Sequence, residues 1–345
     1  MHRCLHLAQL GEGSVAPNPM VGAVLVHDDV IIGEGYHKKW GEAHAEVACL
    51  QSVPEVWRHL IEQSTLYVSL EPCSHFGKTP PCADLIIRHN IPHVVVGCAD
   101  PFKEVAGRGI MKLKAAGVDV KLGVLEKDCR RLNKRFVLFQ EQQRPYISLK
   151  WAQTPDGKIA GERGKRIGIS NAYTNRLVHQ LRSQNMGILV GTNTALFDNP
   201  ELTTRLWPGQ SPVRLVLDKN LRLPASLKLF DGKQQTVVFN ATTQHAHPNL
   251  LYHRLHNWNA VVTELIQVFY QMKLQSILVE GGAQLLQSFI EAGLWDEAIV
   301  ITNQQLSIGK GVAAPQLKQH HLVNVQEVFT DSIHTYANQS NELIK

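Results

Sequence analysis

Three short segments in the first third of the chain carry residue types that suit metal chemistry. His44 opens the segment His44-Ala45-Glu46, just ahead of a helical pattern. Cys73 follows an apolar stretch, and Cys82 precedes a second helical pattern. One imidazole nitrogen and two thiolates suit tetrahedral Zn²⁺ and leave its fourth position for water. A helix N-terminus also lowers the pKa of a nearby thiol, which favours the thiolate ligand.

Glu46 lies two residues after His44 and is the candidate catalytic acid and base. Zinc lowers the pKa of a bound water to about 7, and a neighbouring carboxylate can take the released proton and pass it to a departing ammonia. The order H-x-E, then P-C, then C is the pattern of zinc deaminases that act on nucleobases. The alternative is a closed structural zinc site, for which His75 is the nearby candidate for a fourth protein ligand.

Asn18 stands between two prolines, just before the first expected pair of strands. Its side-chain amide can offer both a donor and an acceptor to a heterocycle, so we expect it to bind substrate. The alternative is a Pro-rich turn without a role in binding.

The second half of the chain contains two strand-to-glycine turns. The apolar stretch Ser276–Val279 runs into Glu280-Gly281-Gly282 and then into a helical pattern, and Gly187–Val190 runs into Gly191. Paired glycines let the backbone approach a phosphate, and a helix N-terminus supplies oriented N–H groups. No G-x-G-x-x-G follows a strand, so an ordinary dinucleotide fingerprint is absent. The alternative is that these glycines simply end their strands.

The elements that must position these residues alternate between strand and helix patterns. In the first half we expect a hairpin, three further strands and three helices: strands Val21–Val26, Val30–Ile32, Leu66–Leu70, Val94–Cys98 and Val118–Leu122, and helices Ala43–Gln51, Ala83–His89 and Gly109–Ala116. A linking helix over Arg130–Phe139 should follow. The second half should contain a helix at Ala283–Ile290 and strands at Tyr146–Trp151, Gly187–Val190, Val213–Asp218, Thr236–Phe239, Ala260–Thr263, Ser276–Val279 and Glu297–Ile301. Such spacing predicts two α/β domains, 1–144 and 145–345.

Composition limits the classes of protein and partner. The chain has 345 residues, of which 44% are hydrophobic and 19% charged, as expected for two globular domains rather than a disordered chain. The longest apolar stretches fall far short of the ~20 residues of a membrane span, and the N-terminus does not resemble a signal peptide. We therefore expect a soluble, cytoplasmic protein with reduced cysteines. The net charge of +5 is not gathered in a basic run, which favours a small anionic substrate over nucleic acid.

Several motifs of the first half, taken together, resemble the deaminase domain of the bifunctional RibD family of riboflavin biosynthesis. They are VAPNPMVGAVLV, GEGYH, HAE, SLEPCSHFGKTPPC, Asp100-Pro101 and VAGRG. Eight residues separate Cys73 from Cys82, whereas nucleoside and tRNA deaminases usually have Pro-Cys-x-x-Cys. The resemblance implies a cytidine-deaminase-like α/β/α fold that deaminates 2,5-diamino-6-ribosylamino-4(3H)-pyrimidinone 5′-phosphate, with zinc on His44, Cys73 and Cys82 and proton transfer by Glu46. His75 and Lys78 are further candidates to meet the substrate phosphate.

The second half resembles the reductase domain of the same family, which has a dihydrofolate-reductase-like α/β fold. The motifs are LKWAQTPDGKIAG, LVHQLRSQ, ILVGTNTALFDNPELTTR, RLVLD and ILVEGG. The resemblance implies an NADPH site and a substrate site: Ala152, Gly168, Thr194, Asp198, Lys219 and Gly282 for the cofactor, and Arg166, Arg182, Leu202, Arg205 and Glu280 for the ribosylamino substrate. Arginine forks can pair with a 5′-phosphate, although a surface salt bridge is the alternative for Arg182 and Arg205. Glu280 would polarise or protonate the opening sugar while NADPH reduces C1′ to a ribityl chain.

Two positions depart from the family pattern. Gly168 stands where the family usually has a Trp expected to pack beside the nicotinamide, so Arg166 or a shifted loop would have to compensate. Lys219 replaces a common Ser and could meet an NADPH phosphate. The sequence leaves three alternative functions. The favoured one is a bifunctional deaminase–reductase, and the others are a deaminase with a degraded reductase domain and a nucleic-acid-editing zinc deaminase. Whether the chain forms a homo-oligomer stays open.

Overall fold

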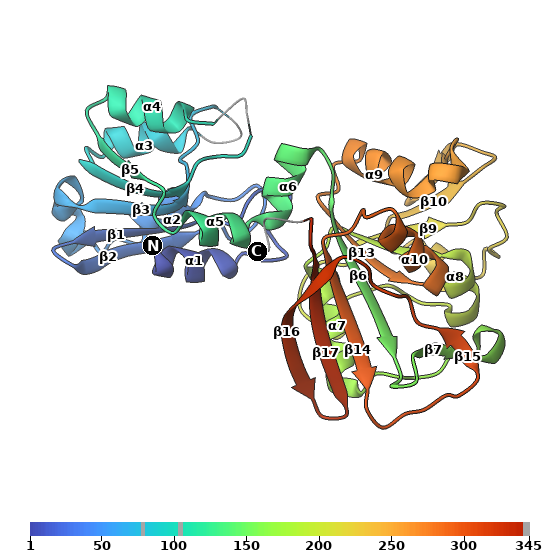
Figure 1. Ribbon diagram of the computed structural model, residues 1–345. Coiled ribbons are helices and arrows are strands. Elements are labelled where there is room, and N and C mark those ends of the chain that lie inside the picture. The colour runs from blue at the N-terminus through green and yellow to red at the C-terminus, as the bar shows by residue number, and fades with distance from the viewer. Residues whose placement is uncertain (77–79, 103–105, 341–345) are drawn as a thin grey trace. The chain divides into compact units, whose positions relative to one another are not determined.

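The computed structural model describes residues 1–76, 80–102 and 106–340. Within it the chain forms two compact units, Met1–Gln143 and Arg144–Lys345 (Figure 1). No helix among the described residues is both long and apolar enough to cross a membrane.

The first unit contains a five-stranded sheet in the order β2-β1-β3-β4-β5. Its strands are β1 (Gly22–His27), β2 (Val30–Tyr36), β3 (Thr65–Leu70), β4 (His93–Cys98) and β5 (Asp119–Leu122). β1 runs antiparallel to β2 and β3, and β3, β4 and β5 are parallel. Parallel strands need helical crossovers, which supply the helices that cover the sheet.

Helices cover both faces of this sheet. On one face lie α1 (His2–Gln9) and α5 (Glu126–Leu132), and on the other lie α2 (Ala45–Gln51), α3 (Cys82–Arg88) and α4 (Arg108–Ala115). The 3₁₀ helix η1 (Glu55–Gln63) and helix α6 (Lys134–Gln142) complete the unit. Strand β1 shows why two faces form: Ala23 and Leu25 pack into the core beneath α2 and α3, whereas Val24 packs against α1. Successive strand residues point to opposite faces, so one apolar strand serves two layers.

The expected single linking helix over Arg130–Phe139 is wrong, because two helices meet at Asn133. The Asn133 side chain accepts a hydrogen bond from the Met20 N–H (2.8 Å) and donates one to the Met20 carbonyl (2.9 Å). Asn133 itself has φ −96° and ψ 24°, outside the helical range. A contact with a residue more than a hundred positions away therefore accompanies a break that periodicity does not reveal.

The second unit contains a ten-stranded sheet in the order β11-β12-β10-β9-β8-β13-β6-β14-β17-β16. Its strands are β6 (Tyr146–Gln153), β8 (Gly187–Gly191), β9 (Val213–Leu217), β10 (Thr236–Asn240), β11 (His245–His247), β12 (Leu250–Arg254), β13 (Ser276–Gly281), β14 (Glu297–Asn303), β16 (His320–Val328) and β17 (Asp331–Asn338). The strands from β12 to β14 in this order are parallel, whereas β11, β17 and β16 are antiparallel additions at the two edges. A separate two-stranded sheet joins β7 (Lys158–Gly161) and β15 (Gly311–Ala313).

Four helices pack against the large sheet: α7 (Ala172–Ser183), α8 (Thr192–Asp198), α9 (Val261–Gln271) and α10 (Ala283–Glu291). Short 3₁₀ helices lie at η2 (Glu162–Gly164), η3 (Lys228–Phe230) and η4 (Trp258–Ala260). Strand β8 again supplies two cores, because Leu189 packs with α9 and α10 while Ile188 and Val190 pack on the opposite face. Both faces of this parallel sheet are buried, which explains its nearly continuous apolar strands.

The strand expected at Ala260–Thr263 is wrong, because η4 and the start of α9 occupy this segment. Val262, Leu265, Ile266 and Phe269 recur at helical spacing and bury one face on the core. The four-residue apolar run that suggested a strand is the first turn of that amphipathic helix.

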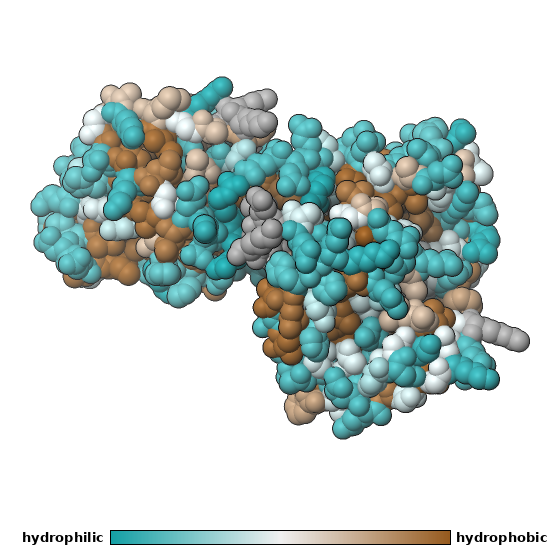
Figure 2. Space-filling view, in the orientation of Figure 1, coloured by the Kyte–Doolittle hydropathy of each residue, from teal (hydrophilic) through white to brown (hydrophobic). Residues whose placement is uncertain are grey.

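The two C-terminal strands, the β11–β12 edge and the small β7–β15 sheet are further elements that the sequence did not predict. Strand β16 forms one edge of the large sheet and exposes the apolar side chains of Leu322, Val323 and Val325. Figure 2 shows apolar surface at the lower left of this unit, where β16 lies in Figure 1.

Candidate functional site

Three elements of the first unit bring the expected metal ligands together. His44 is the N-cap of α2, Cys73 lies in the turn after β3, and Cys82 is the first residue of α3. The His44 Nδ1 atom lies 3.6 Å from Cys73 Sγ and 3.3 Å from Cys82 Sγ, and all three atoms fall within 4.8 Å of one another. The sequence therefore predicted three residues that the fold does place side by side.

The spacing of these three atoms fits Zn²⁺. Tetrahedral bonds of about 2.0–2.1 Å to nitrogen and 2.3 Å to sulfur would separate the two kinds of ligand atom by roughly 3.5 Å. The observed separations of 3.3 and 3.6 Å agree with that requirement. No fourth His, Cys, Asp or Glu joins the cluster among the described residues, and His75 is not part of it. Among the described residues, the cluster thus offers the three protein ligands that are typical of a catalytic zinc site.

The charge state of the sulfur ligands is controlled by their neighbours. The backbone N–H of Cys82, at the start of α3, points at Cys73 Sγ at 3.2 Å. A hydrogen bond from the Cys82 side chain is the main cause that lowers the pKa of the Cys73 thiol to about 4. The same pairing raises the pKa of Cys82, because two adjacent thiolates repel each other until a cation lies between them.

Glu46 lies in the first turn of α2 and is only 3% exposed. Burial raises the pKa of its carboxyl to about 7, with a further contribution from the nearby Cys73. A carboxyl group with a pKa near neutrality can both accept and donate a proton, as a general acid–base group must. Its position beside the ligand cluster agrees with the predicted role.

The orientation of the Asn18 amide depends on His37, which the sequence analysis did not single out. His37 Nδ1 lies 3.0 Å from the Ala43 carbonyl and must donate to it, so His37 Nε2 is the acceptor for the Asn18 Nδ2 group at 3.2 Å. Burial lowers the pKa of His37, in agreement with a neutral ring. Because Nδ2 is turned to His37, Asn18 Oδ1 is the amide atom left to accept a bond from a ligand. The GEGYH motif was the available signal for His37.

Glu71, two residues before Cys73, is a second buried group that the sequence analysis missed. Its Oε1 accepts hydrogen bonds from the backbone N–H groups of Gly109 (2.8 Å) and Ile110 (3.3 Å), and its Oε2 accepts from Asp100 (3.1 Å) and Gly107 (2.9 Å). The carboxylate thus joins the turn that carries Cys73 to the N-terminus of α4. A Cβ at Gly109 would lie 2.0 Å from the Pro72 carbonyl, so this approach requires glycine.

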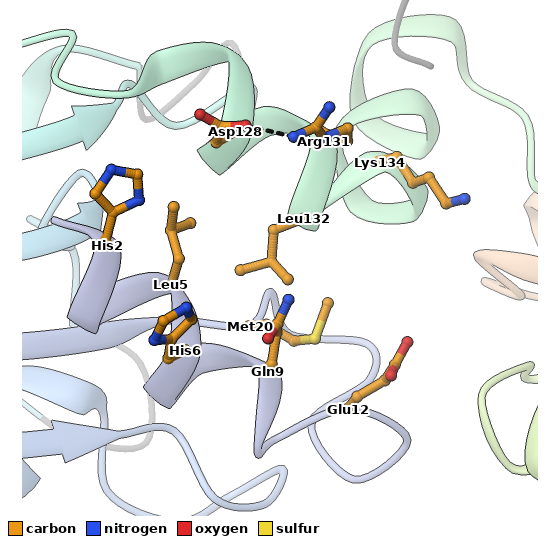
Figure 3. A pocket seen from close by; sticks show the side chains of 10 residues that line it. All are labelled: His2, Leu5, His6, Gln9, Glu12, Met20, Asp128, Arg131, Leu132 and Lys134. Atoms are coloured by element: carbon orange, nitrogen blue, oxygen red, sulfur yellow. Dashed lines mark hydrogen bonds and ion pairs between the residues drawn. The ribbon is translucent and has the colours of Figure 1, made fainter. Parts of the chain in front are cut away.

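A cavity of about 670 Å³ lies in the same unit but away from the metal ligands (Figure 3). It lies between α1 and the α5–α6 segment, with Leu5, Met20 and Leu132 among the apolar lining residues and His2 and His6 on α1. None of the three ligands or Glu46 lines it, so it is not the candidate catalytic site.

Lys78, one of the two candidates for a phosphate contact near Cys73, lies outside the described residues.

In the second unit, the candidate cofactor and substrate residues gather at the carboxyl ends of adjacent parallel strands. Four of them lie at or just after the ends of β6, β8 and β13: Ala152 near the end of β6, Thr194 on α8 after β8, Glu280 near the end of β13 and Gly282 directly after it. Lys219 follows β9. Strands β6, β13, β8 and β9 are neighbours in the sheet. Ligands of open α/β sheets bind at this edge, where the strands end and the helices begin.

The two glycines after Glu280 allow a close approach of the backbone to α8. Gly281 has φ +135°, a conformation that favours glycine, and a Cβ at Gly282 would lie 3.1 Å from Thr194 Oγ1. Gly282 is also the N-cap of α10, so the first N–H groups of that helix face the same edge. This geometry supports the expectation that Thr194 and Gly282 contact a cofactor phosphate.

Arg182 and Glu280 form a buried ion pair, an arrangement that changes the expectation for both. Arg182 Nε and Nη2 each donate to a Glu280 carboxylate oxygen at 2.8 Å, and Arg182 Nη1 donates to the Thr203 carbonyl at 3.2 Å. The Nε and Nη2 groups of Arg182 are thus occupied by a protein carboxylate rather than open to a substrate phosphate. The alternative for Arg182 was a surface salt bridge. A salt bridge is present, but it is buried, because the side chains are only 12% and 8% exposed.

Glu280 is ionised in this arrangement. Burial by itself would raise its pKa, but the charges of Arg182 and Lys150 outweigh burial and lower the pKa to about 2. Near neutral pH Glu280 is therefore expected to be a carboxylate, which favours its expected role of polarising the opening sugar over that of protonating it. Lys150 and His179 were both missed: burial lowers the pKa of Lys150, and burial lowers that of His179 to about 4.

The remaining candidates lie on the surface of the same unit or near it. Arg205 is exposed, its Nη1 donates to Thr203 Oγ1 at 3.2 Å, and it forms the expected alternative of a surface salt bridge, with Glu201 at 3.6 Å. Leu202 is buried with φ +53°. Asp198 has a pKa raised by burial and opposed by the charge of Arg166. Lys219 places its ammonium 5.2 Å from the centre of the Trp258 ring.

Gly168 is exposed, and an added Cβ there would meet nothing within 4 Å. The position that carries Trp in the family pattern thus has open space around it.

These features define a two-domain enzyme, with a metal-dependent deaminase unit followed by a reductase unit. The model of the cytidine and deoxycytidylate deaminase zinc-binding region matches residues 1–98, and the model of the RibD C-terminal domain matches residues 145–330. The expected cytidine-deaminase-like and dihydrofolate-reductase-like α/β fold class is confirmed. The chain belongs to the RibD family of riboflavin biosynthesis proteins.

Curated relatives match nearly the whole chain. The riboflavin biosynthesis protein RibD of Aquifex aeolicus is 38% identical over 321 residues, which cover 90% of this chain and 88% of that protein. The RibD protein of Escherichia coli is 36% identical over 318 residues, which cover 87% and 85%. A solved structure from Thermotoga maritima superposes with a TM-score of 0.89 at 34% identity and covers 98% of this chain and 97% of that one. That structure is described as a diaminohydroxyphosphoribosylaminopyrimidine deaminase/5-amino-6-(5-phosphoribosylamino)uracil reductase.

Proposed function

We propose that this chain catalyses two steps of riboflavin biosynthesis, with the deamination in residues 1–144 and the reduction in residues 145–345. The substrate is 2,5-diamino-6-ribosylamino-4(3H)-pyrimidinone 5′-phosphate, and the deaminated product is then reduced to its ribityl form. The observation that carries the proposal is the cluster of His44, Cys73 and Cys82 beside the buried Glu46, on one chain with a RibD reductase unit. The alternative of a nucleic-acid-editing deaminase gives no reason for a RibD reductase unit on the same chain.

In the deaminase unit, His44, Cys73 and Cys82 would hold Zn²⁺. Zinc would supply a hydroxide nucleophile at neutral pH. Glu46 would take the proton released on forming that nucleophile and deliver it to the departing ammonia, which its pKa near 7 permits. Asn18 would accept a hydrogen bond through Oδ1 from an N–H group of the pyrimidine, because His37 holds the amide in that orientation.

In the reductase unit, NADPH would supply the hydride. Thr194, Asp198 and Gly282, together with Ala152 at the end of β6, would bind and orient the cofactor at the carboxyl edge of the sheet. Arg205 would meet the 5′-phosphate, since its guanidinium is exposed. Glu280 would lie near the reacting sugar carbon as an anion. It would take the ribosylamino N–H proton as the C1′–O bond opens and pass it to the ring oxygen, while solvent would supply the proton that accompanies the hydride.

The open space at Gly168 bears on the alternative of a deaminase with a degraded reductase. An exposed glycine cannot cover a nicotinamide ring, and Arg166 or a shifted loop would have to compensate. Because an added Cβ at Gly168 would meet no atom within 4 Å, we expect the variant Gly168→Trp to be accommodated. If the cofactor lies beside this position, Gly168→Trp should tighten NADPH binding.

The partner of the enzyme in this proposal is a small phosphorylated pyrimidine, with neither nucleic acid nor membrane required, and its place of action is the cytoplasm. A homo-oligomer is also proposed, with the exposed apolar edge of β16 as its candidate contact surface. Light scattering of the purified chain and of a Val325→Lys variant tests the last point, because a contact through β16 should be weakened by the added charge.

The test of the two activities is mass spectrometry of the products formed by purified, zinc-loaded protein, with and without NADPH. We expect an amino-to-oxo exchange without NADPH and a further gain of two hydrogens only with NADPH. Glu46→Gln should abolish the first change, whereas the matched surface variant Glu55→Gln should not. Deamination without the hydrogen gain would support the degraded-reductase alternative, and no turnover in either step would refute the assignment.

A further inference from the structure

Arg182 joins two segments of the reductase unit that are far apart in sequence. It lies on α7, and its guanidinium contacts both the end of β13 at Glu280 and the segment of Thr203. The pair Arg182–Glu280 spans 98 positions of the chain. Arg182 therefore connects the candidate proton acceptor to the loop that carries Arg205.

The geometry of the ion pair restricts the carboxylate. Two parallel N–H···O bonds of 2.8 Å hold both Glu280 oxygens in the plane of the guanidinium. Three of the five Arg182 N–H groups are used by Glu280 and Thr203, so at most two remain for any ligand. A lysine could not reproduce this arrangement, because its ammonium is a point charge without a planar fork.

Glu280 is surrounded mainly by positive charge. Lys150 on β6 and Arg182 on α7 both lower its pKa, and His179, one helix turn before Arg182, contributes in the same direction. His179 is largely neutral above pH 4 because burial lowers its own pKa to about 4. Removal of Arg182 would thus leave Lys150, whose own pKa is lowered by burial, as the main cation among the groups that act on Glu280.

We propose that Arg182 is a positioning residue that acts on the reduction through Glu280, by fixing the direction of its carboxylate and keeping it anionic. In that state Glu280 takes the ribosylamino N–H proton as the C1′–O bond breaks and passes it to the ring oxygen. The hydride from NADPH then adds to C1′, and solvent supplies the proton for the nitrogen. The same guanidinium ties the Thr203 segment to α7 and thereby places Arg205. This inference rests on the proposed reductase function. It differs from the expected role of Arg182 as a phosphate ligand. In that role, replacing Arg182 would lower kcat/KM whether or not Glu280 is present.

The experiment compares the full-length protein with Arg182→Met, Arg182→Lys, Glu280→Gln and the double variant Arg182→Met/Glu280→Gln. NADPH oxidation is measured between pH 5 and 8 with the deaminated substrate. Without the guanidinium, Glu280 should bind a proton at higher pH. When the pH is lowered from 7 to 5, kcat/KM of Arg182→Met should therefore decrease at least tenfold more than kcat/KM of the unchanged protein. Arg182→Lys should keep the charge and show a smaller shift with a lowered kcat.

Two further measurements separate the possible roles. In the Glu280→Gln background, Arg182→Met should change kcat/KM less than twofold, because its effect acts through Glu280. Arg205→Met is the matched control and should raise KM without moving the pH profile. A pH profile of Arg182→Met equal to that of the unchanged protein, or full additivity with Glu280→Gln, would overturn the proposal.

A readout without turnover separates this inference from the proposed function. Carboxyl ¹³C NMR of the protein labelled at Glu follows the titration of Glu280, assigned as the signal missing from Glu280→Gln. Its midpoint should rise in Arg182→Met, and an unchanged midpoint would refute the electrostatic role of Arg182. If the chain shows the expected titration of Glu280 but no NADPH oxidation, the proposed function is refuted and the electrostatic role of Arg182 is not.

Discussion

The carboxylate of Glu71 supports the turn that carries Cys73, and its replacement should show how strongly. In Glu71→Gln the shape is kept, but only one of the two side-chain oxygens remains. Because each oxygen accepts from two backbone N–H groups, two buried donors lose their acceptor and face an amide N–H₂ instead. The helix α4 and the segment before it are thus released from the Pro72–Cys73 turn.

The size of the effect follows from the number of bonds. A buried donor left without a partner costs about 1–3 kcal/mol, so two such donors cost about 2–6 kcal/mol. In a unit of this size, each kcal/mol lowers the melting temperature by roughly 4 °C, which predicts a decrease of roughly 8–24 °C. Zinc should also dissociate faster, because Cys73 loses part of its support.

Differential scanning calorimetry of the zinc-loaded protein measures the melting temperature, and a colorimetric chelator measures the zinc release rate. The matched control is Glu62→Gln, whose carboxylate accepts a single exposed hydrogen bond from Asn90 at 3.2 Å. This control should change stability by less than about 0.5 kcal/mol. If Glu71→Gln melts within 2 °C of the unchanged protein and keeps its zinc as long, the Glu71 hydrogen bonds do not support the metal site and the reasoning is wrong.

Four further outcomes are expected. Removing zinc with a chelator, or replacing His44 by Ala, should abolish deamination and leave NADPH oxidation unchanged, since the metal ligands lie in the first unit alone. Glu46→Gln should lower kcat of deamination by about 10²–10⁴ while one zinc per chain is retained. His37→Leu should raise KM for deamination roughly tenfold, because losing one orienting hydrogen bond to Asn18 is worth about 1–1.5 kcal/mol. Glu280, whose pKa is lowered from 4.5 to about 2, should stabilise the second unit fully above pH 5 and lose about 3 kcal/mol of that contribution as the pH falls toward 2.

Each of these outcomes has a control. Metal content by atomic emission accompanies the assays of His44→Ala and Glu46→Gln, and a Glu46→Gln protein with unchanged kcat would remove Glu46 from the mechanism. For His37→Leu, an unchanged KM would mean that the Asn18 amide needs no support. The acid denaturation profile of Glu280→Gln should be flatter between pH 5 and 2 than that of the unchanged protein, and parallel profiles would contradict the sign of the pKa change.

Much of the deaminase site could be predicted from the sequence, because its chemistry is concentrated in short segments. His44 and Glu46 share one turn of a helix, and Cys73 and Cys82 are nine positions apart at the ends of recognisable elements. Local patterns of apolar residues also predicted most strands of both sheets, since a parallel strand buried on both faces is a continuous apolar run. Such signals depend only on neighbours along the chain.

The elements that were predicted wrongly are those in which tertiary contacts outweigh local pattern. The apolar run Ala260–Thr263 has the composition of a strand, but it is helical because the residues after it complete an amphipathic face against the core. Asn133 interrupts a helical pattern because its side chain bonds both backbone groups of Met20.

For the polar residues too, some roles could be predicted from the sequence and others depend on tertiary contacts. The sequence by itself determined the candidate metal ligands, the candidate catalytic glutamate and the α/β class of both units, because ligand type, spacing and apolar periodicity are properties of short segments. Only the tertiary structure decided that Arg182 faces Glu280, that His37 orients Asn18 and that Glu71 holds the start of α4. These contacts join residues up to 98 positions apart, and their charge states depend on burial that arises only when the sheets and helices have packed.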